Sequence, residues 1–317
     1  MKIGIDIMGG DYAPEETTLG AIAAWRELPS HVKLILFGKR ELMLPFFKRE
    51  GVDENVMEIV DTPSVISMSD HPTKAFQQKN DSSIVVGFQW LKEGRIDAFA
   101  SAGNTGAMLV GSMFTVKTIP GILRPAIGSL LPKEDGGWGL ILDVGVNADC
   151  KPEVLQQFSV LGSIYAENLL HIKNPRIGLM SIGEEEEKGN ILVKEAHQLI
   201  KETKEINFIG NVEGRDLFND KADVVVCDGF TGNVMLKQAE AFYSMILKRG
   251  INDEYFNRFD YEDYGGTPIL GINSEVIIAH GISKAKAIKN MTLLCKEVCE
   301  AGLSGKIAKA FSKETVS

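Results

Sequence analysis

Short apolar runs alternate with longer segments of helical spacing from one end of the sequence to the other. KIGIDI at 2–7 and VKLILF at 32–37 are rich in apolar and β-branched residues, and each is followed by a segment in which apolar residues recur at helical intervals. Strands that alternate with helices favour a mostly parallel sheet with helices on both faces. The pattern therefore predicts an α/β fold, in which ligands bind at the carboxyl ends of the strands.

The same pattern places the individual elements. Strands are expected at 2–7, 32–37, 56–60, 97–101, 126–131, 138–144, 177–182, 206–209, 223–227 and 276–279. Helices are expected at 14–28, 39–50, 82–93, 105–116, 152–171, 191–203, 232–248 and 283–301. Gly136 and Gly137 predict a hairpin between two of the strands. We expect residues 1–317 to form a single α/β catalytic unit with room for two lobes, and 250–266 to form an irregular surface excursion.

Charge and polarity exclude several classes of protein. A net charge of −9, from 34 basic and 43 acidic side chains, disfavours nucleic acid as a partner. The uncharged stretch from Ala98 to Val116 is as long as a membrane span, but it contains Ser101, Asn104 and Thr105 and is too polar to face lipid. It predicts a buried strand, a loop and a buried helix instead. Acidic residues also interrupt the N-terminal apolar run, so we expect no export signal and a cytoplasmic protein.

The cysteines do not have the spacing of a metal site. Cys295 and Cys299 are four residues apart in a helical pattern, without a second pair or a nearby histidine. We therefore expect Cys150, Cys227, Cys295 and Cys299 to be reduced, partly buried thiols, and we expect no metal.

Four predicted strand ends share one design, in which an apolar strand leads through small residues and Asn or Gly into a helix. They are residues 6–11, 101–106, 183–190 and 228–233. Glycines let backbone N–H groups approach an anion, and the N-terminus of the following helix adds positive partial charge. The pattern predicts a site for phosphate or an oxyanion, and it matches neither a Walker loop nor a dinucleotide fingerprint. The candidate binding residues are Gly9, Gly10, Asp11, Gly103, Asn104, Thr105, Gly106, Asn190 and Gly232.

Three side chains in or beside these loops are candidates for catalysis. Lys188 follows four glutamates, which are typical of a solvated helix start, and it could bind an anion or form an ion pair with one of those glutamates. Asn233 could donate its carboxamide to an oxyanion or cap a helix. Asn104 and Asn147 carry the same ambiguity, with a role in a cap or a turn as the alternative to oxyanion binding. His280 follows a strand and could protonate a leaving group, or it could be a packing or capping residue.

Seven motifs together resemble one known family in order and spacing. They are DIMGGDYAP at the start, SAGNTGAM at 101–108, LDVGVNADCKPE at 142–153, EEEEKGN at 184–190, CDGFTGNV at 227–234, YGGTPILGI at 264–272 and AHGIS at 279–283. The sequence is similar over nearly its whole length to PlsX-type phosphate acyltransferases. The catalytic Lys and Asn of that family fall on Lys188 and Asn233.

The resemblance implies a fold related to phosphotransacetylases and to isocitrate-dehydrogenase-like enzymes. It implies transfer of a long-chain acyl group from acyl-acyl carrier protein to inorganic phosphate, which gives acyl phosphate for phospholipid synthesis. It also implies a homodimer, no cofactor, peripheral contact with the membrane and a downstream glycerol-3-phosphate acyltransferase. The sequence departs from the family pattern at Gln77 and Gln78, where arginines are frequent, at Leu123, where an acidic residue is usual, and at 250–264, which is short and acidic.

Other assignments remain open on the sequence alone. A short-chain phosphotransacylase that uses acyl-CoA shares the chemistry, an NAD-dependent dehydrogenase shares the fold, and a binding module would keep the glycines. If acyl carrier protein is the donor, its acidic surface requires a basic face. Lys284, Lys286 and Lys289 on the last expected helix are the candidate face, and a solvated helix face is the alternative.

Overall fold

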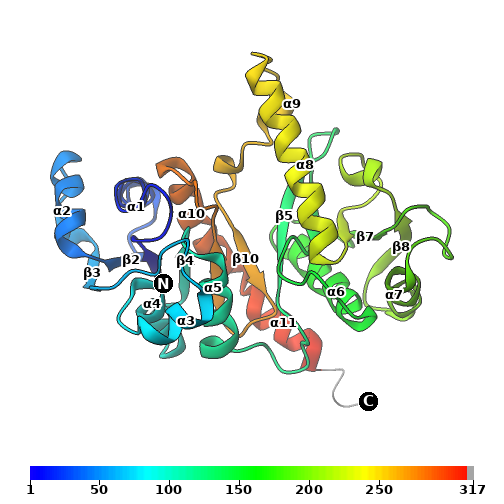
Figure 1. The fold of residues 1–317 in the computed structure, drawn as a ribbon, viewed down its shortest axis with the longest axis horizontal. Coiled ribbons are helices and arrows are strands. Elements are labelled where there is room, and N and C mark those ends of the chain that lie inside the picture. The colour runs from blue at the N-terminus through cyan, green and yellow to red at the C-terminus, as the bar shows by residue number, and fades with distance from the viewer. Residues whose placement is uncertain (313–317) are drawn as a thin grey trace. The chain divides into compact units, whose positions relative to one another are not determined.

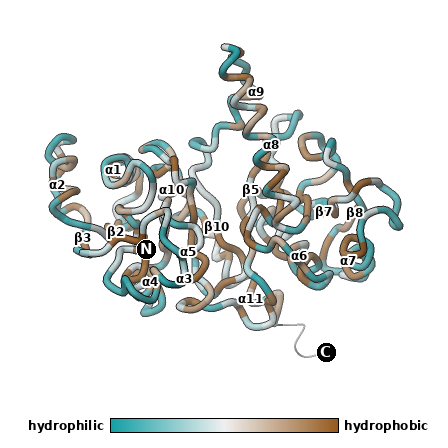
Figure 2. The backbone as a smooth tube through the Cα atoms, viewed as in Figure 1, coloured by the Kyte–Doolittle hydropathy of each residue, from teal (hydrophilic) through white to brown (hydrophobic). Residues whose placement is uncertain are grey.

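The computed structural model describes residues 1–312, and the described chain divides into two compact units (Figure 1). Unit 1 comprises Met1–Thr118 and Tyr261–Ser304. Unit 2 comprises Ile119–Asp260 and the chain from Gly305 on. Each unit has strands of its own and helices that cover them. Hydrophobic residues recur along the strands of both units, while the turns between elements are hydrophilic (Figure 2).

The strands of unit 1 lie in the order β3-β2-β1-β4-β11-β10, and all neighbours are parallel except β10 and β11. Their bounds are β1 Lys2–Asp6, β2 Lys33–Gly38, β3 Glu58–Asp61, β4 Ala98–Ser101, β10 Thr267–Leu270 and β11 Glu275–Ile278. The helices are α1 Glu15–Glu27, α2 Arg40–Arg49, α3 Pro72–Gln78, α4 Ser83–Lys92, α5 Thr105–Gly111 and α10 Ala285–Ala301, with a π-helical turn at Ser112–Val116 and 3-10 turns at Glu54–Val56 and Tyr261–Asp263. The carboxyl ends of β1, β4 and β11 therefore meet at one edge of the sheet.

Alternate residues of the unit 1 strands bury opposite faces of the sheet. Ile3 and Ile5 of β1 belong to the core cluster that contains Ile288 and Met291 of α10. On the other face the rings of Phe37, Phe88 and Phe99 pack edge to face. Close helix packing on this aromatic layer requires Gly87, because a Cβ there would lie 2.2 Å from the Phe99 ring.

The strands of unit 2 lie in the order β5-β6-β9-β7-β8. Their bounds are β5 Ala126–Pro132, β6 Trp138–Leu142, β7 Arg176–Met180, β8 Asn207–Val212 and β9 Val224–Val226. The helices are α6 Pro152–Asn168, α7 Ile191–Glu202, α8 Gly229–Lys248 and α9 Glu254–Asn257, with a 3-10 turn at Gly214–Leu217, and α11 Leu303–Ser312 follows at the C-terminus. The antiparallel β5–β6 pair confirms the expected hairpin, and the other neighbours are parallel.

The structure confirms most of the expected elements and adds several. Residues 98–116 form the expected strand, loop and helical segment, but the helical segment is only partly buried, because Thr105 and Phe114 are exposed. Among the residues that the structure describes, no helix is both long enough and apolar enough to cross a membrane. The sequence pattern did not reveal α3, β10 or α11, which are short elements next to Pro or Gly. The 250–266 segment contains α9 and the 3-10 turn at Tyr261–Asp263.

Candidate active site

A buried carboxylate organises the loops of unit 1. The Asp6 side chain, at the end of β1, accepts a hydrogen bond from the Ser101 hydroxyl at 2.7 Å and another from the Met8 amide at 3.0 Å. Ser101 Oγ in turn accepts the Gly103 amide at 2.8 Å. Burial raises the pKa of Asp6, and the hydrogen bonds from its neighbours oppose this rise. The ends of β1 and β4 are thus joined through one carboxyl group.

Three of the predicted binding glycines are required by close backbone contact or by conformation. A Cβ at Gly9 would lie 2.4 Å from Asp6 Oδ2 and 2.7 Å from the Gly103 nitrogen, so Gly9 and Gly103 pack against each other. Gly10 has φ +112°, a conformation that L side chains rarely adopt. The Asp11 amide donates to the Gly281 carbonyl at 2.7 Å, which joins the loop after β1 to the loop after β11. The structure therefore brings Gly9, Gly10, Asp11 and Gly103 together.

At the start of α5, the predicted binding residues Asn104 and Gly106 make contacts within the protein. Asn104 Oδ1 accepts the Ala107 amide at 3.0 Å, so Asn104 is the N-cap of α5, the alternative left open by the sequence. Its Nδ2 donates to the carbonyls of Ser67, Met68 and Asp70 at 3.0–3.3 Å. Thr105 is exposed at the first turn, and a Cβ at Gly106 would meet the Pro72 ring at 2.3 Å. The Asn104 side chain is buried and anchors the 67–70 loop.

His280 directly follows β11, next to the Gly281 carbonyl that accepts the Asp11 amide. Its ring is half-buried and packs against Tyr261, with the ring centroids 5.0 Å apart. Its carbonyl accepts the Ser283 amide at 3.0 Å. The packing alternative describes these contacts, and a role for His280 as an acid remains a prediction.

In unit 2, the acidic run before Lys188 forms a loop, and the expectation of a helix start was wrong. Helix α7 begins only at Ile191, where the Asn190 side chain accepts the Val193 amide at 2.9 Å as its N-cap. Residues 184–187 lie in bends and turns. Glu184 pairs with Lys221 at 2.6 Å, and Glu186 pairs with Lys201 at 2.5 Å. Two of the four glutamates are thus paired with lysines from outside the loop.

Lys188 is an exposed cation that forms no ion pair with any residue in the described range 1–312. The alternative of an ion pair with the preceding glutamates is therefore not observed. Its stem lies over Gly183, where a Cβ would be 2.9 Å from Lys188 Cγ. Gly189 has φ +105°, and a Cβ there would lie 2.7 Å from Val193. These two glycines let the loop turn tightly on either side of the lysine.

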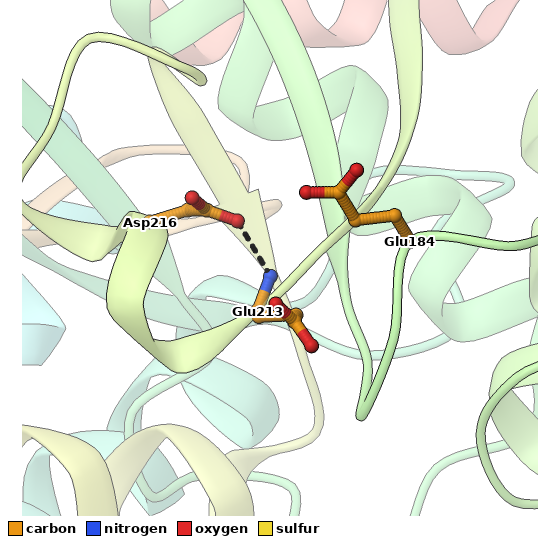
Figure 3. Close-up of side chains that lie close together, drawn as sticks. All are labelled: Glu184, Glu213 and Asp216. Carbon is orange, nitrogen blue, oxygen red and sulfur yellow. Dashed lines mark hydrogen bonds between the residues drawn. The ribbon is translucent and has the colours of Figure 1, made fainter.

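Beside this loop, three carboxylates gather within 4.8 Å of one another: those of Glu184, Glu213 and Asp216 (Figure 3). Asp216 accepts the Glu213 amide at 2.9 Å, which is half of a capping box for the 3-10 turn (Figure 3). Lys221 lies 2.6 Å from Glu184 and 3.0 Å from Asp216, and Glu213 pairs with Arg215. The positive charge for this cluster thus comes from the protein itself, and the cluster ties the Lys188 loop to the segment after β8.

A second buried carboxylate, Asp143, follows β6. Its Oδ1 accepts the amides of Ile127 and Val144, and its Oδ2 accepts the Asn147 amide at 2.7 Å and the Asn147 side chain at 2.9 Å. Asn147 also donates to the Pro125 carbonyl at 2.8 Å, so it is a turn residue, one of its two alternatives. Burial raises the pKa of Asp143 against these hydrogen bonds.

The first turn of α8 is packed on this Asp143 loop. A Cβ at Gly232 would lie 1.9 Å from the Asp143 carbonyl oxygen, which explains the glycine. Asp228, not Asn233, caps the helix, because its side chain accepts the Thr231 amide at 2.8 Å. The cap alternative for Asn233 was therefore wrong. The exposed Asn233 side chain lies near Gly145, with its Oδ1 3.5 Å from the position of a Cβ on that glycine.

Lys188 and Asn233 follow neighbouring parallel strands, β7 and β9, and both are exposed at the carboxyl edge of the unit 2 sheet. Such an edge can present a cation and a carboxamide donor to one anionic ligand. Sequence reasoning missed Asp6 and Asp143, although each lies at the end of an apolar strand just before a glycine-rich loop. That position was the available signal.

The expected basic face on α10 is largely neutralised. Lys286 pairs with Asp263 at 2.5 Å, and Lys289 pairs with Glu27 at 2.9 Å. The Lys284 ammonium lies 5.6 Å from the centre of the exposed Tyr12 ring. The solvated-face alternative describes Lys286 and Lys289 better than a free basic patch does.

Comparison with known proteins identifies close sequence relatives. The model of a family described as "Fatty acid synthesis protein" matches residues 1–305. Phosphate acyltransferase of Dictyoglomus thermophilum is 44% identical, with 99% of each chain covered. Phosphate acyltransferase of Clostridioides difficile is also 44% identical, with 92% of this chain and 90% of that protein covered.

Comparison with solved structures bears on the fold alone. A phosphotransacetylase from Streptococcus pyogenes superposes with a TM-score of 0.67 at 17% identity, over 95% of this chain and 94% of that chain. EutD phosphotransacetylase from Staphylococcus aureus gives a TM-score of 0.64 at 15% identity, over 94% of each chain. The fold class expected from the sequence is confirmed.

Proposed function

This chain belongs to the fatty acid synthesis protein family, in which its relatives are phosphate acyltransferases, and on that premise we propose that it transfers a long-chain acyl group from acyl-acyl carrier protein to inorganic phosphate. The enzyme is an acyltransferase. Its product in this proposal is an acyl phosphate, which enters phospholipid synthesis through a glycerol-3-phosphate acyltransferase.

The reaction mainly requires that the enzyme position phosphate against the thioester. Phosphate is an anionic nucleophile at neutral pH and needs little base catalysis, but it must be held against the thioester carbonyl. Lys188 is suited to this task, because it is exposed at the carboxyl edge of the sheet while the four preceding glutamates leave it without an ion pair in the described chain. This free cation is the observation that carries the proposal. Lys188 binds phosphate and orients one oxygen toward the carbonyl carbon.

Asn233 supplies the second element. When phosphate attacks, the carbonyl oxygen becomes an oxyanion, and a carboxamide N–H that points at it stabilises the tetrahedral intermediate by about 2.7–4 kcal/mol. Asn233 is free for this role because Asp228 caps the helix. The intermediate then collapses, the carbon–sulfur bond breaks and the pantetheine thiolate leaves. His280 is the candidate acid for that thiolate.

The loops of unit 1 contribute in a different way from the one the glycine pattern suggests. The amides of Met8, Asp11 and Gly103 are already bonded to the Asp6 carboxyl, the Gly281 carbonyl and the Ser101 hydroxyl. We propose that these amides do not bind the anion, and that the anion is held mainly by side chains such as Lys188. The finer assignments, namely a homodimer, a cytoplasmic location with peripheral membrane contact, and acyl carrier protein as the donor, belong to the same proposal.

The test is formation of acyl phosphate from palmitoyl-acyl carrier protein and phosphate, with palmitoyl-CoA and acetyl-CoA in parallel. Lys188→Ala is expected to lower kcat/KM about 100-fold or more without lowering the unfolding temperature. Lys194→Ala, an exposed lysine on α7, is the matched control and should retain wild-type turnover. Wild-type turnover by Lys188→Ala would remove the assigned role. Turnover of acetyl-CoA alone would favour a short-chain phosphotransacylase, and two structural neighbours are named phosphotransacetylases.

A further inference from the structure

One backbone carbonyl closes the turn that carries Lys188. The Glu185 oxygen accepts the Lys188 amide at 3.0 Å and also the Asn211 side-chain nitrogen, Nδ2, at 2.8 Å. Asn211 lies on β8 and is buried. The turn before the lysine is therefore tied directly to the sheet by a buried amide.

The other end of the Asn211 carboxamide is fixed by His197 of α7. Asn211 Oδ1 lies 2.9 Å from His197 Nδ1, and both side chains are buried. Because the Asn211 nitrogen donates to Glu185, its oxygen must accept, and this assigns the hydrogen to His197 Nδ1. His197 Nε2 faces the Glu186 carboxylate at 3.9 Å. A continuous chain thus runs from His197 through Asn211 to the carbonyl that holds Lys188.

A β-bulge aims Asn211 at this histidine. Ile177 of β7 pairs with Phe208 and the next residue, Gly178, pairs with Gly210, so β8 has one extra residue at this point. Residues three apart on a regular strand face opposite sides of the sheet. With the extra residue, Phe208 and Asn211 both contact His197, the Phe208 ring at 5.0 Å between centroids. Gly210, with φ +93°, permits the bulge, and bulges of this kind re-aim side chains near functional sites.

The other ties of the loop are weaker. The ion pairs of Glu184 with Lys221 and of Glu186 with Lys201 have side chains that are 30–58% exposed, and exposed pairs hold a loop only loosely in salt. The Asn211 contact is buried and directional, and it acts one turn of backbone away from Lys188. A buried polar pair is not the most stabilising choice for a core, which an apolar pair of similar volume would fill at lower cost.

We propose that Asn211 and His197 are positioning residues for phosphate binding, which fix the turn from which Lys188 reaches the phosphate. The inference rests on the proposed function, because the hydrogen bonds of Asn211 and His197 position a phosphate ligand only if Lys188 holds the phosphate. Neither residue touches the substrate. Their loss leaves Lys188 present but lets its backbone move.

The decisive variant is Asn211→Asp, which is isosteric, keeps an oxygen for His197 and replaces the donor to Glu185 with a second oxygen. We expect the KM for phosphate to rise about tenfold with a smaller change in kcat, together with faster hydrogen exchange in residues 184–190. Asn207→Asp is the matched control on the same strand, where the Asn207 amide donates to the Asn174 carbonyl at 3.2 Å, and it should leave both unchanged. An unchanged KM and unchanged exchange in Asn211→Asp would overturn the proposal.

Two variants of His197 test the other end of this chain of hydrogen bonds. His197→Asn places an amide nitrogen near the position of Nδ1 and is expected to keep the KM for phosphate near the wild-type value, whereas His197→Leu is expected to raise it several-fold. Equal values for the two would refute the role of the nitrogen. His197→Leu also serves as the loop-releasing variant if Asn211→Asp does not fold.

Comparison in the Lys188→Ala background separates this inference from the proposed function. If Lys188→Ala retains full activity, the function assigned to Lys188 fails. If Lys188→Ala is impaired and Asn211→Asp is not, only the positioning role proposed for Asn211 and His197 is refuted. The expected result is that Asn211→Asp has no further effect on the KM for phosphate once Lys188 is absent, and full additivity would refute positioning through Lys188.

Discussion

Gly232→Ala should shift the Asn233 side chain without removing it. In the native structure a Cβ at residue 232 would lie 1.9 Å from the Asp143 carbonyl oxygen, whereas real Cβ atoms essentially never approach closer than 3.0 Å. The first turn of α8 must therefore move by about 1.1 Å, because the blocking atom is backbone and the Cys227 sulfur, at 2.9 Å, closes another direction. Asn233 is the next residue and moves with the turn.

We expect Gly232→Ala to lower both the free energy of unfolding and the turnover. Overpacking of this kind destabilises a protein by about 1–3 kcal/mol, and a displacement of about 1 Å in a catalytic group lowers turnover about 100-fold. Urea unfolding and kcat at saturating acyl-acyl carrier protein measure the two effects separately. Gly305→Ala is the control, since a Cβ there meets nothing within 4 Å and should leave kcat unchanged. A Gly232→Ala variant that is destabilised but has wild-type kcat would refute the claim that turnover depends on the position of the Asn233 carboxamide.

Three further predictions concern stability and thiol chemistry. Burial alone would raise the pKa of Asp223, but hydrogen bonds from Arg176 and Lys133 hold that pKa well below its usual range. Asp223→Asn should therefore cost about 3–5 kcal/mol of unfolding free energy at pH 7. Because a carboxyl group with a depressed pKa stabilises the fold only above its unfolded pKa, urea unfolding should show this difference shrinking as the pH falls below about 4. Burial raises the pKa of the Cys150 thiol to about 12, so iodoacetamide at pH 8 should leave it unmodified until the protein unfolds, and rapid labelling of native protein would contradict this. Asn104→Ala removes a helix cap and the side-chain nitrogen that contacts three backbone carbonyls, and it should lower the unfolding free energy by about 2–4 kcal/mol. A loss under about 1 kcal/mol would show that water replaces these hydrogen bonds.

The order of strands and helices could be predicted from the sequence because it depends on local periodicity. Apolar runs such as 2–7 and 32–37 became β1 and β2, and the glycine pair at 136–137 became the hairpin between β5 and β6. The glycine-rich strand ends were also visible, since a loop that passes close to other backbone can carry little else. Lys188 and Asn233 were also visible, as polar residues within these glycine-rich strand ends.

The hydrogen-bond partners of these residues were decided by the tertiary structure. Nothing in the sequence states that Asp228 caps α8 and leaves Asn233 free, or that two lysines distant in sequence pair with Glu184 and Glu186. The extra residue in β8 that turns Asn211 toward His197 is likewise invisible to a pattern that assumes regular alternation. Periodicity is a property of neighbours along the chain, whereas a donor or an ion takes whichever acceptor the packed sheet brings within about 3 Å, and only the folded chain decides which one that is.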